Sequence, residues 1–226
     1  MDLTIIWWHG IEGDFMYYFV DEANVAPYRS YCSKVLEELR DNLNSKREIN
    51  SQFILIGSGG KNMVTQNEDG PFDLDYNLRI ISMPDEYRND LKKLKDTIRN
   101  GLNKIVGKTL FSDGQDSKSV ITSRLVLNND EQVFSFDIAI LAENKNGNLC
   151  RLLHNKLYGQ FTWNEVPNSH NVKDRADLLK RKGRWNEVRQ TYLDLKNMYL
   201  SRNDNNHPSF IVYVEAVNQI YNKYWY

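Results

Sequence analysis

Three aspartates in this chain stand where carboxylates on β-strands could act together. Asp73 and Asp75 alternate with apolar residues in the run FDLDYNLRII, residues 72–81, and alternate residues of a strand point to the same face. Asp137 is the one charged residue of a second alternating run, VFSFDIAIL, residues 133–141, and small residues flank it on its own face. Aspartate is uncommon in strands, and carboxylates at close range repel each other. The pattern therefore indicates a bound cation.

Magnesium or manganese is the cation that these residues suit. Carboxylate oxygens are hard ligands, and the two runs contain no cysteine or histidine, which favours Mg²⁺ or Mn²⁺ over zinc. Substrate phosphates commonly complete a magnesium site. A phosphate-binding segment should therefore lie close to the aspartates.

A glycine-rich turn, GSGG at residues 57–60, can supply the phosphate contacts. It follows an apolar strand, and its glycines let backbone N–H groups approach an anion closely. A helix expected to begin near Lys61 would direct its positive end to the same place. The spacing fits neither a P-loop nor a dinucleotide-binding fingerprint, because both need another residue type in place of Asn62. Phosphate contacts beside metal-binding carboxylates indicate a nucleotide site.

The order of these motifs resembles that of the DNA polymerase β-like nucleotidyltransferase superfamily. The shared features are a strand that ends in Gly57-Ser58, an apolar-Asp-apolar-Asp strand and a lone aspartate on a later strand, Asp137. The resemblance covers roughly residues 28–141. Together and in this order the motifs are far more specific than Gly-Ser or Asp-x-Asp alone.

The resemblance implies a role for each matching residue. Asp73 and Asp75 would hold two metal ions, and Asp137 would complete the site for the metal that activates an acceptor hydroxyl. Gly57 and Ser58 would contact the triphosphate of the nucleotide. Two-metal chemistry of this kind would transfer a nucleoside monophosphate to the hydroxyl and release pyrophosphate.

The expected donor is a nucleoside triphosphate, with ATP the first choice, and the acceptor stays open. A small molecule such as an aminoglycoside-type antibiotic, a protein hydroxyl, an RNA 3′ end and a second nucleotide all fit. The alternative is a non-catalytic nucleotide-binding or protein-interaction module with the same fold, or a sheet whose wet face merely carries two aspartates. The intact third aspartate, Asp137, favours an active enzyme.

Basic residues gather late in the chain and allow two interpretations. They could form a solvated helix face. Alternatively, Lys180, Lys182 or Arg184 could face the carboxylates and bind the triphosphate or an RNA phosphate. Lys61 is a further candidate for nucleotide binding, but its role and that of Thr65 stay open because the gap between the glycine turn and the first aspartate is slightly longer than the family's. The basic cluster late in the chain consists of Lys173, Arg175, Lys180, Arg181, Lys182, Arg184 and Arg189.

Apolar periodicity predicts a mixed α/β (α+β) fold, with flanking helices around a small mixed sheet. Helices are expected over residues 28–45 and 85–106, and a strand over 119–127. The strand signal fades beyond about residue 150, where two helical stripes follow, from Trp185 and from Phe210 onward.

The expected division is therefore a catalytic lobe over residues 1–150 and a helical C-terminal lobe over 151–226. An aromatic hairpin is expected to open the first lobe, within residues 1–27, from the runs LTIIWW and FMYYFV.

Bulk composition is that of an ordinary soluble globular protein. Hydrophobic residues make up 41% of the chain and charged residues 26%, with a net charge of −1. RNA is thus a possible acceptor that the net charge does not indicate. Cys32 and Cys150 are too few for a disulfide framework, and no long apolar segment predicts a membrane span, so a cytoplasmic location is expected. Nothing in the sequence indicates the oligomeric state.

Overall fold

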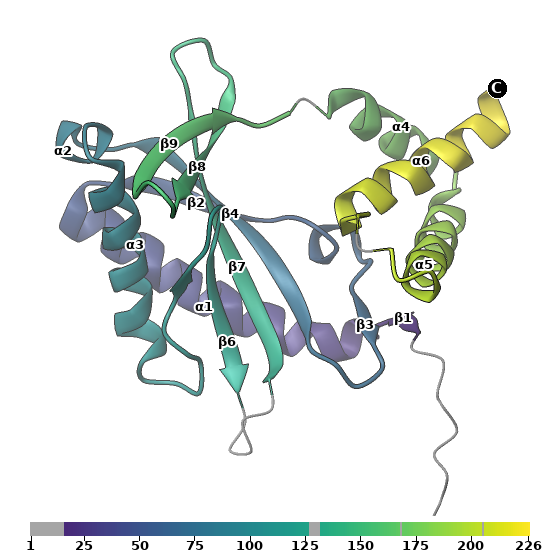
Figure 1. Cartoon of the computed structure of the whole chain (residues 1–226), viewed down its shortest axis with the longest axis horizontal. Coiled ribbons are helices and arrows are strands. Elements are labelled where there is room, and N and C mark those ends of the chain that lie inside the picture. The colour runs from purple at the N-terminus through teal and green to yellow at the C-terminus, as the bar shows by residue number, and fades with distance from the viewer. Residues whose placement is uncertain (1–15, 127–131, 168, 205) are drawn as a thin grey trace, which may run out of the picture.

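The computed structural model describes residues 16–126, 132–167, 169–204 and 206–226. Within these ranges, a mixed sheet is flanked on one side by helices and followed by a group of three helices (Figure 1). This arrangement confirms the predicted fold class. The elements are β1 (Tyr17–Phe19), α1 (Glu22–Arg47), β2 (Asn50–Leu55), the 3-10 turn η1 (Gly59–Lys61), β3 (Thr65–Asn67), β4 (Phe72–Ser82), α2 (Asp85–Arg88), α3 (Leu91–Val106), β5 (Gln115–Asp116), β6 (Ile121–Val126), β7 (Gln132–Glu143), β8 (Leu149–Asn155), β9 (Gln160–Glu165), α4 (His170–Arg181), α5 (Trp185–Ser201) and α6 (Ser209–Trp225).

The main sheet is built around the parallel pair β4 and β7. Its strand order is β2-β4-β7-β6-β5, with β8 paired to β7 and β9 paired to β8. The strands β2 and β6 run antiparallel to their neighbours β4 and β7. Because β4 lies inside the sheet, both of its edges are hydrogen-bonded, and its side chains hold fixed positions on the two faces.

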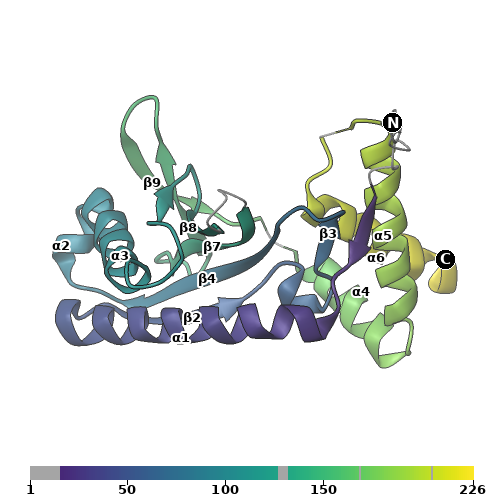
Figure 2. The same cartoon turned by 90° about the horizontal axis from the view of Figure 1, so that it is seen from below.

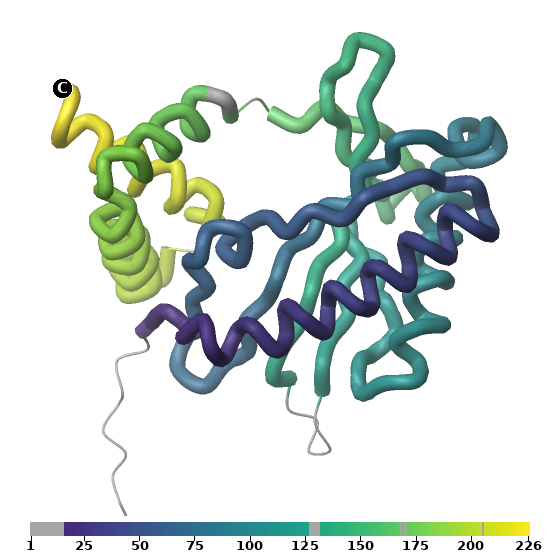
Figure 3. Tube along the Cα trace, turned by 180° about the vertical axis from the view of Figure 1, so that it is seen from behind, coloured from purple at the N-terminus to yellow at the C-terminus, as the bar shows by residue number. Residues whose placement is uncertain are grey.

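One face of the sheet is apolar and packs on α1 and α3. The apolar residues of β4 alternate with the polar ones and are buried, as in Leu74 and Tyr76. They share a core with α1 residues such as Leu36 and Leu39. Figure 2 shows α1 running along one side of β2 and β4, and Figure 3 shows it crossing the back of the sheet. The polar residues of β4 therefore face away from these helices.

Two helices, α1 and α3, begin at aspartates whose side chains cap them. The Asp21 side chain accepts a hydrogen bond from the Ala23 N–H, which starts α1 ahead of Pro27 and extends it beyond the predicted range 28–45. The predicted helix over residues 85–106 is divided into α2 and α3, because the Asp90 side chain accepts from the Lys93 N–H and starts a new helix.

The sequence prediction that strands end near residue 150 is wrong. The strands β8 and β9 form an antiparallel hairpin that extends the sheet through β7 as far as Glu165. Many side chains of this hairpin are exposed or half-buried, so its sequence lacks a long apolar run. The helical part begins only at His170. A division into two lobes stays a prediction.

The helices α4, α5 and α6 pack around a second apolar core, which also receives Met63 from the loop after η1. The short ribbon of β1 and β3 lies against α5. The Asn197 side chain in α5 accepts a hydrogen bond from the Tyr17 N–H at 2.6 Å and donates one to the Tyr17 carbonyl at 3.0 Å. The first strand of the predicted N-terminal hairpin lies outside the described residues, while β1 pairs with β3.

No helix within the described ranges combines the length and the apolar character that crossing a bilayer requires.

Candidate active site

The three aspartates lie on adjacent strands and on the same face of the sheet. Asp75 of β4 is the register partner of Asp137 of β7, and Asp73 is the partner of Ser135. Paired residues of neighbouring strands project to the same face, which is the face opposite α1. The prediction that Asp137 lies on a strand next to Asp73 and Asp75 is confirmed.

Burial raises the pKa of all three carboxyls, and repulsion between carboxylates adds to the shift at Asp73 and Asp75. Burial, followed by the charges of Asp73 and Asp137, raises the pKa of Asp75 to about 6. Burial and the charge of Asp137 raise the pKa of Asp73, although its side chain reaches solvent. Burial also raises the pKa of Asp137, against a hydrogen bond from Thr122 and the charge of Arg124.

The donor set fits a hard divalent cation. Within the described ranges, none of the three aspartates forms an ion pair with a basic side chain. Carboxylates that repel each other and have no ion-pair partner would be stabilised by Mg²⁺ or Mn²⁺.

The carboxylates do not already converge on a single point. Among the described residues, no group of three or more His, Cys, Asp or Glu side chains is gathered closely enough to hold a metal ion. The Thr122 hydroxyl donates to Asp137 Oδ1 at 2.5 Å and fixes one oxygen of that carboxylate. A bound cation would therefore have to draw the side chains of Asp73 and Asp75 toward Asp137.

The glycine turn lies directly against the carboxylates. Gly57 has a φ of +61°, and a Cβ placed there would collide with the Asp75 carboxylate. The Ser58 carbonyl accepts hydrogen bonds from the N–H groups of Lys61 and Met63, at 3.1 Å and 2.9 Å. Gly57 is therefore needed both for its backbone conformation and for its closeness to Asp75.

The helix predicted to begin near Lys61 does not form. The turn η1 ends at Lys61, and Asn62 adopts a left-handed conformation with φ of 56°, which redirects the chain into β3. A helix N-terminus therefore contributes nothing to phosphate binding at this turn.

Lys61 reaches the site through its side chain. Its Nζ donates to the Gly57 carbonyl at 2.7 Å and lies 4.8 Å from the centre of the Tyr213 ring. Burial lowers the pKa of Lys61, the charge of Asp75 raises it, and the charge of Lys180 lowers it further. The structure thus brings Lys61 close to Asp75, whereas the exposed Lys180 has its Nζ 4.5 Å from the centre of the Trp185 ring, so nucleotide binding by Lys180 stays a prediction.

The other two basic candidates lie differently. Arg184 is engaged within the helical part, where it contacts Glu187 at 3.2 Å and stacks 4.4 Å from the centre of the Tyr224 ring. Lys182 is exposed at the end of α4. Nucleotide binding by Lys182 and Arg184 stays a prediction.

Lys196 is a candidate that sequence reasoning missed. Its Nζ donates to Thr65 Oγ1 at 2.7 Å and lies 3.8 Å from the centre of the Tyr17 ring. Burial lowers the pKa of Lys196 to about 8, although the charge of Asp73 opposes this shift. In sequence it is one lysine on an amphipathic helix, and only the packing of α5 on the β1–β3 ribbon carries it to the site.

Two arginines on the sheet were also missed. The charge of Arg124 of β6 opposes the rise in the pKa of Asp137, and the charge of Arg151 of β8 opposes the rise in the pKa of Asp75. The alternation of Thr122 and Arg124 with buried Ile121 and Ser123 could have indicated that β6 shares the polar face of the sheet.

Comparisons with solved structures agree on the architecture. A mutant of the Vibrio cholerae di-nucleotide cyclase DncV in complex with ATP and GTP superposes with a TM-score of 0.62 at 11% identity, over 91% of this chain and 70% of that chain. The chain has the nucleotidyltransferase fold. The STING-associated CdnE c-di-GMP synthase from Capnocytophaga granulosa gives 0.59 at 16% identity, over 92% and 63%. E. coli CdnC with ATP gives 0.54 at 15%, over 89% and 61%.

These matches confirm the resemblance to the DNA polymerase β-like superfamily at the level of fold. The chain spans about three fifths of the length of the first structures that it matches, 62% and 61%. No family model matches the chain, and no curated protein matches it in sequence.

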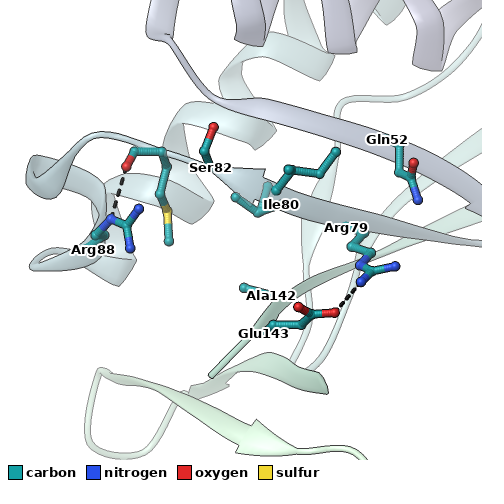
Figure 4. Close-up of a pocket in the computed structure, with 9 residues that line it drawn as sticks. Gln52, Arg79, Ile80, Ser82, Arg88, Ala142 and Glu143 are labelled. Carbon is teal, nitrogen blue, oxygen red and sulfur yellow. Dashed lines mark hydrogen bonds and ion pairs between the residues drawn. The ribbon is translucent and has the colours of Figure 1, made fainter. Parts of the chain in front are cut away.

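A hollow elsewhere on the nucleotidyltransferase fold lies apart from the carboxylates (Figure 4). It begins at Arg79, which lies roughly 13 Å along β4 from Asp75, since each strand residue adds about 3.3 Å. An ion pair between Arg79 and Glu143 closes one side, and the Arg88 Nε donates to the Met83 carbonyl at 3.1 Å on the other. The charged side chains that line the hollow are thus already paired with other groups of the protein.

Proposed function

We propose that this protein is a metal-dependent nucleotidyltransferase. It would move a nucleoside monophosphate from a nucleoside triphosphate to a hydroxyl group and release pyrophosphate. The observation that carries the proposal is the pairing of Asp75 with Asp137 in register, with Asp73 on the same face and Gly57 against the Asp75 carboxylate. The shared fold supports it, because DncV and CdnC were solved with bound nucleotides.

The proposed reaction is an in-line displacement at the α-phosphorus of the donor. The acceptor oxygen forms the new P–O bond, the bond between the α-phosphorus and the bridging oxygen breaks, and pyrophosphate leaves with the electron pair. Mg²⁺ or Mn²⁺ bound by Asp73, Asp75 and Asp137 would lower the pKa of the acceptor hydroxyl and neutralise phosphate charge. The Asp137 oxygen that Thr122 leaves free is available to accept the hydroxyl proton.

The residues around the carboxylates have separate proposed roles in binding the triphosphate and stabilising its charge. Gly57, which has no side chain, lets the turn lie directly against the Asp75 carboxylate, and Ser58 follows it in the same turn, where both would contact the triphosphate. Lys61 lies near Asp75 and Lys196 lies near Asp73, and both would stabilise negative charge on the leaving pyrophosphate. These two lysines have no acidic partner within ion-pair distance in the described part of the chain, so their charges are available to a ligand.

ATP is the proposed donor, in keeping with the ATP complexes of DncV and CdnC. The decisive test is pyrophosphate release from each of the four ribonucleoside triphosphates with Mg²⁺ or Mn²⁺. Asp137→Asn should abolish release and leave nucleotide binding nearly intact, because Asp73, Asp75 and the glycine turn are unchanged. The matched control is Asp41→Asn on the exposed side of α1, which should behave as wild type.

The same samples separate the proposal from a non-catalytic module. Binding of a triphosphate should raise the melting temperature, since a ligand at a hundredfold excess over its Kd stabilises by about 2.7 kcal/mol. Metal-dependent release that survives in Asp137→Asn would refute the assignment of the carboxylates. Thermal stabilisation without release from any triphosphate, even with a hydroxyl acceptor supplied, would favour the binding module.

A further inference from the structure

The turn between α4 and α5 carries a short run of exposed cations. Residues 180–184 read KRKGR, and Arg181, Lys182 and Arg184 are all exposed to solvent. Gly183 has a φ of +69°, which lets the chain turn sharply between the two helices. Positive charge is therefore concentrated on a few residues at one end of the helical part.

The C-terminal end of α6 packs against this turn. The Arg184 guanidinium lies 4.4 Å from the centre of the Tyr224 ring. Glu187 of α5 accepts hydrogen bonds from the Lys223 Nζ and from the Tyr224 hydroxyl, both at 2.9 Å. These contacts join the cationic turn and the end of α6 into one continuous surface.

Aromatic side chains that follow on α6 remain open to solvent. Trp225 is 38% exposed and Tyr226 is 93% exposed, and Figures 1 and 2 show this end of α6 on the side of the three helices that is turned away from the sheet. Single exposed apolar residues are ordinary, but adjoining aromatic rings next to cations are typical of an interaction site. We name this region the basic–aromatic surface, which consists of Arg181, Lys182, Arg184, Lys223, Tyr224, Trp225 and Tyr226.

The positive charge of the basic–aromatic surface is only partly neutralised. Glu187 forms ion pairs with Arg184 at 3.2 Å and with Lys223 at 2.9 Å. Within the described ranges, Arg181 and Lys182 form no ion pair. The whole chain has a net charge of −1, so the excess of cations is local to this surface. A local excess of this kind is complementary to an anionic partner.

The aromatic rings favour a lipid surface over a nucleic acid as that partner. A single-stranded nucleic acid would stack its bases on open ring faces. Here Arg184 lies over Tyr224, and Trp225 stacks on Tyr221 with 5.2 Å between the ring centres. Tyrosine and tryptophan, with an apolar body and a polar tip, suit the boundary between the headgroups and the acyl chains of a bilayer, where neighbouring cations contact anionic lipids.

We propose that the basic–aromatic surface binds the surface of a bilayer that contains anionic lipids. The cations of the α4–α5 turn would contact the headgroups, and Trp225 and Tyr226 would enter the headgroup boundary. This contact uses neither the carboxylates nor the glycine turn, so it is independent of the proposed nucleotidyl transfer.

The test is flotation of the full chain with lipid vesicles in the absence of nucleotide. One set of vesicles consists of phosphatidylcholine alone, and the other contains phosphatidylglycerol as a minor component. The protein should float with the anionic vesicles only, and the bound fraction should fall as the salt concentration rises, because salt screens the charges.

A pair of double mutants tests the cations. Arg181→Gln/Lys182→Gln should weaken binding to the anionic vesicles by roughly twentyfold or more, since each cation near an anionic leaflet contributes about fivefold. The matched control is Lys104→Gln/Lys108→Gln at the end of α3, which removes the same charge from exposed positions elsewhere. This control should bind nearly as wild type does.

A second pair of variants tests the aromatic residues. Trp225→Ser/Tyr226→Ser should also weaken binding to the anionic vesicles, while the dependence on salt concentration stays that of wild type, because the cations are unchanged. Tyr226→Ser alone changes a side chain that is almost fully exposed, so its effect cannot come from a loss of folding.

Each other outcome overturns the inference in a distinguishable way. Equal losses in the two charge variants would mean that net charge alone drives the binding. Equal flotation with both sets of vesicles would remove the role of anionic lipid. Binding of a short single-stranded RNA, measured by fluorescence anisotropy, without flotation would replace the bilayer with a nucleic acid. The absence of both would refute the surface as a docking site and leave the proposed transfer untouched.

Discussion

Replacing Gly57 by alanine should destabilise the protein and disturb the nucleotide site in one step. Gly57 has a φ of +61°, and this left-handed conformation costs a residue with a Cβ about 1–2 kcal/mol. The added Cβ would also collide with the Asp75 carboxylate, so that either the turn or the aspartate must move. The variant should lose stability through both effects and activity through the second.

Gly159 is the matched control for this prediction. It has the same φ of +61°, and a Cβ placed there meets nothing within 4 Å. Gly159→Ala should therefore report the backbone effect alone, about 1–2 kcal/mol, which lowers the Tm by roughly 2–8 °C in a chain of this size. Gly57→Ala should fall further, and only Gly57→Ala should lose pyrophosphate release.

A double mutant isolates the contact with Asp75. Thermal and urea unfolding of Gly57→Ala would be compared in the wild-type and Asp75→Ala backgrounds, where the second background removes the colliding carboxylate. In that background the loss of stability should shrink to the value of Gly159→Ala. Equal losses at Gly57 and Gly159, or an undiminished loss without the Asp75 carboxylate, would refute the geometry of the turn.

Three further changes have defined outcomes. Asp75→Asn should raise the Tm at pH 8 but not at pH 4, because the folded pKa of about 6 exceeds the usual 3.8 and stability is lost as the pH rises through this window; an equal effect at both pH values, in the absence of metal, would contradict the shift. Triphosphate affinity, measured by calorimetry, should fall as the pH rises through about 8, where Lys196 loses its proton, and Lys196→Arg should abolish that fall. Asp90→Ala should cost about 1 kcal/mol in urea unfolding by removing the cap of α3, with pyrophosphate release unchanged.

The sequence was most informative for strands in which apolar and polar residues alternate, because this alternation is visible directly in the sequence. Asp73, Asp75 and Asp137 each interrupt an alternating apolar run, and this alternation placed them on the strands where the structure has them. The register that sets Asp75 opposite Asp137 could not be predicted, because it depends on how two distant strands align on a shared core.

Side chains that reach the site from other elements left no local signal. Lys196 and Thr65 are hydrogen-bonded across 131 residues of sequence, and Lys196 by itself looks like any polar position of an amphipathic helix. The hairpin of β8 and β9 was missed because partly exposed strands lack an apolar run. The sequence predicts a helix that begins near Lys61, where the structure has a short 3-10 turn over Gly59–Lys61, because propensity alone does not reveal the left-handed conformation of Asn62.

The parallel pairing of β4 and β7 also governs when the carboxylates can first meet during folding. Asp75 and Asp137 are register partners although 62 positions separate them in the chain. Parallel strands need a long connection, and contacts between distant residues form late because closing a long loop is entropically unfavourable. The helix-rich segment that precedes β6 can form early, but no fragment that ends before β7 contains the complete carboxylate set. A growing chain on the ribosome would therefore lack the proposed transfer activity until β7 had emerged and docked beside β4.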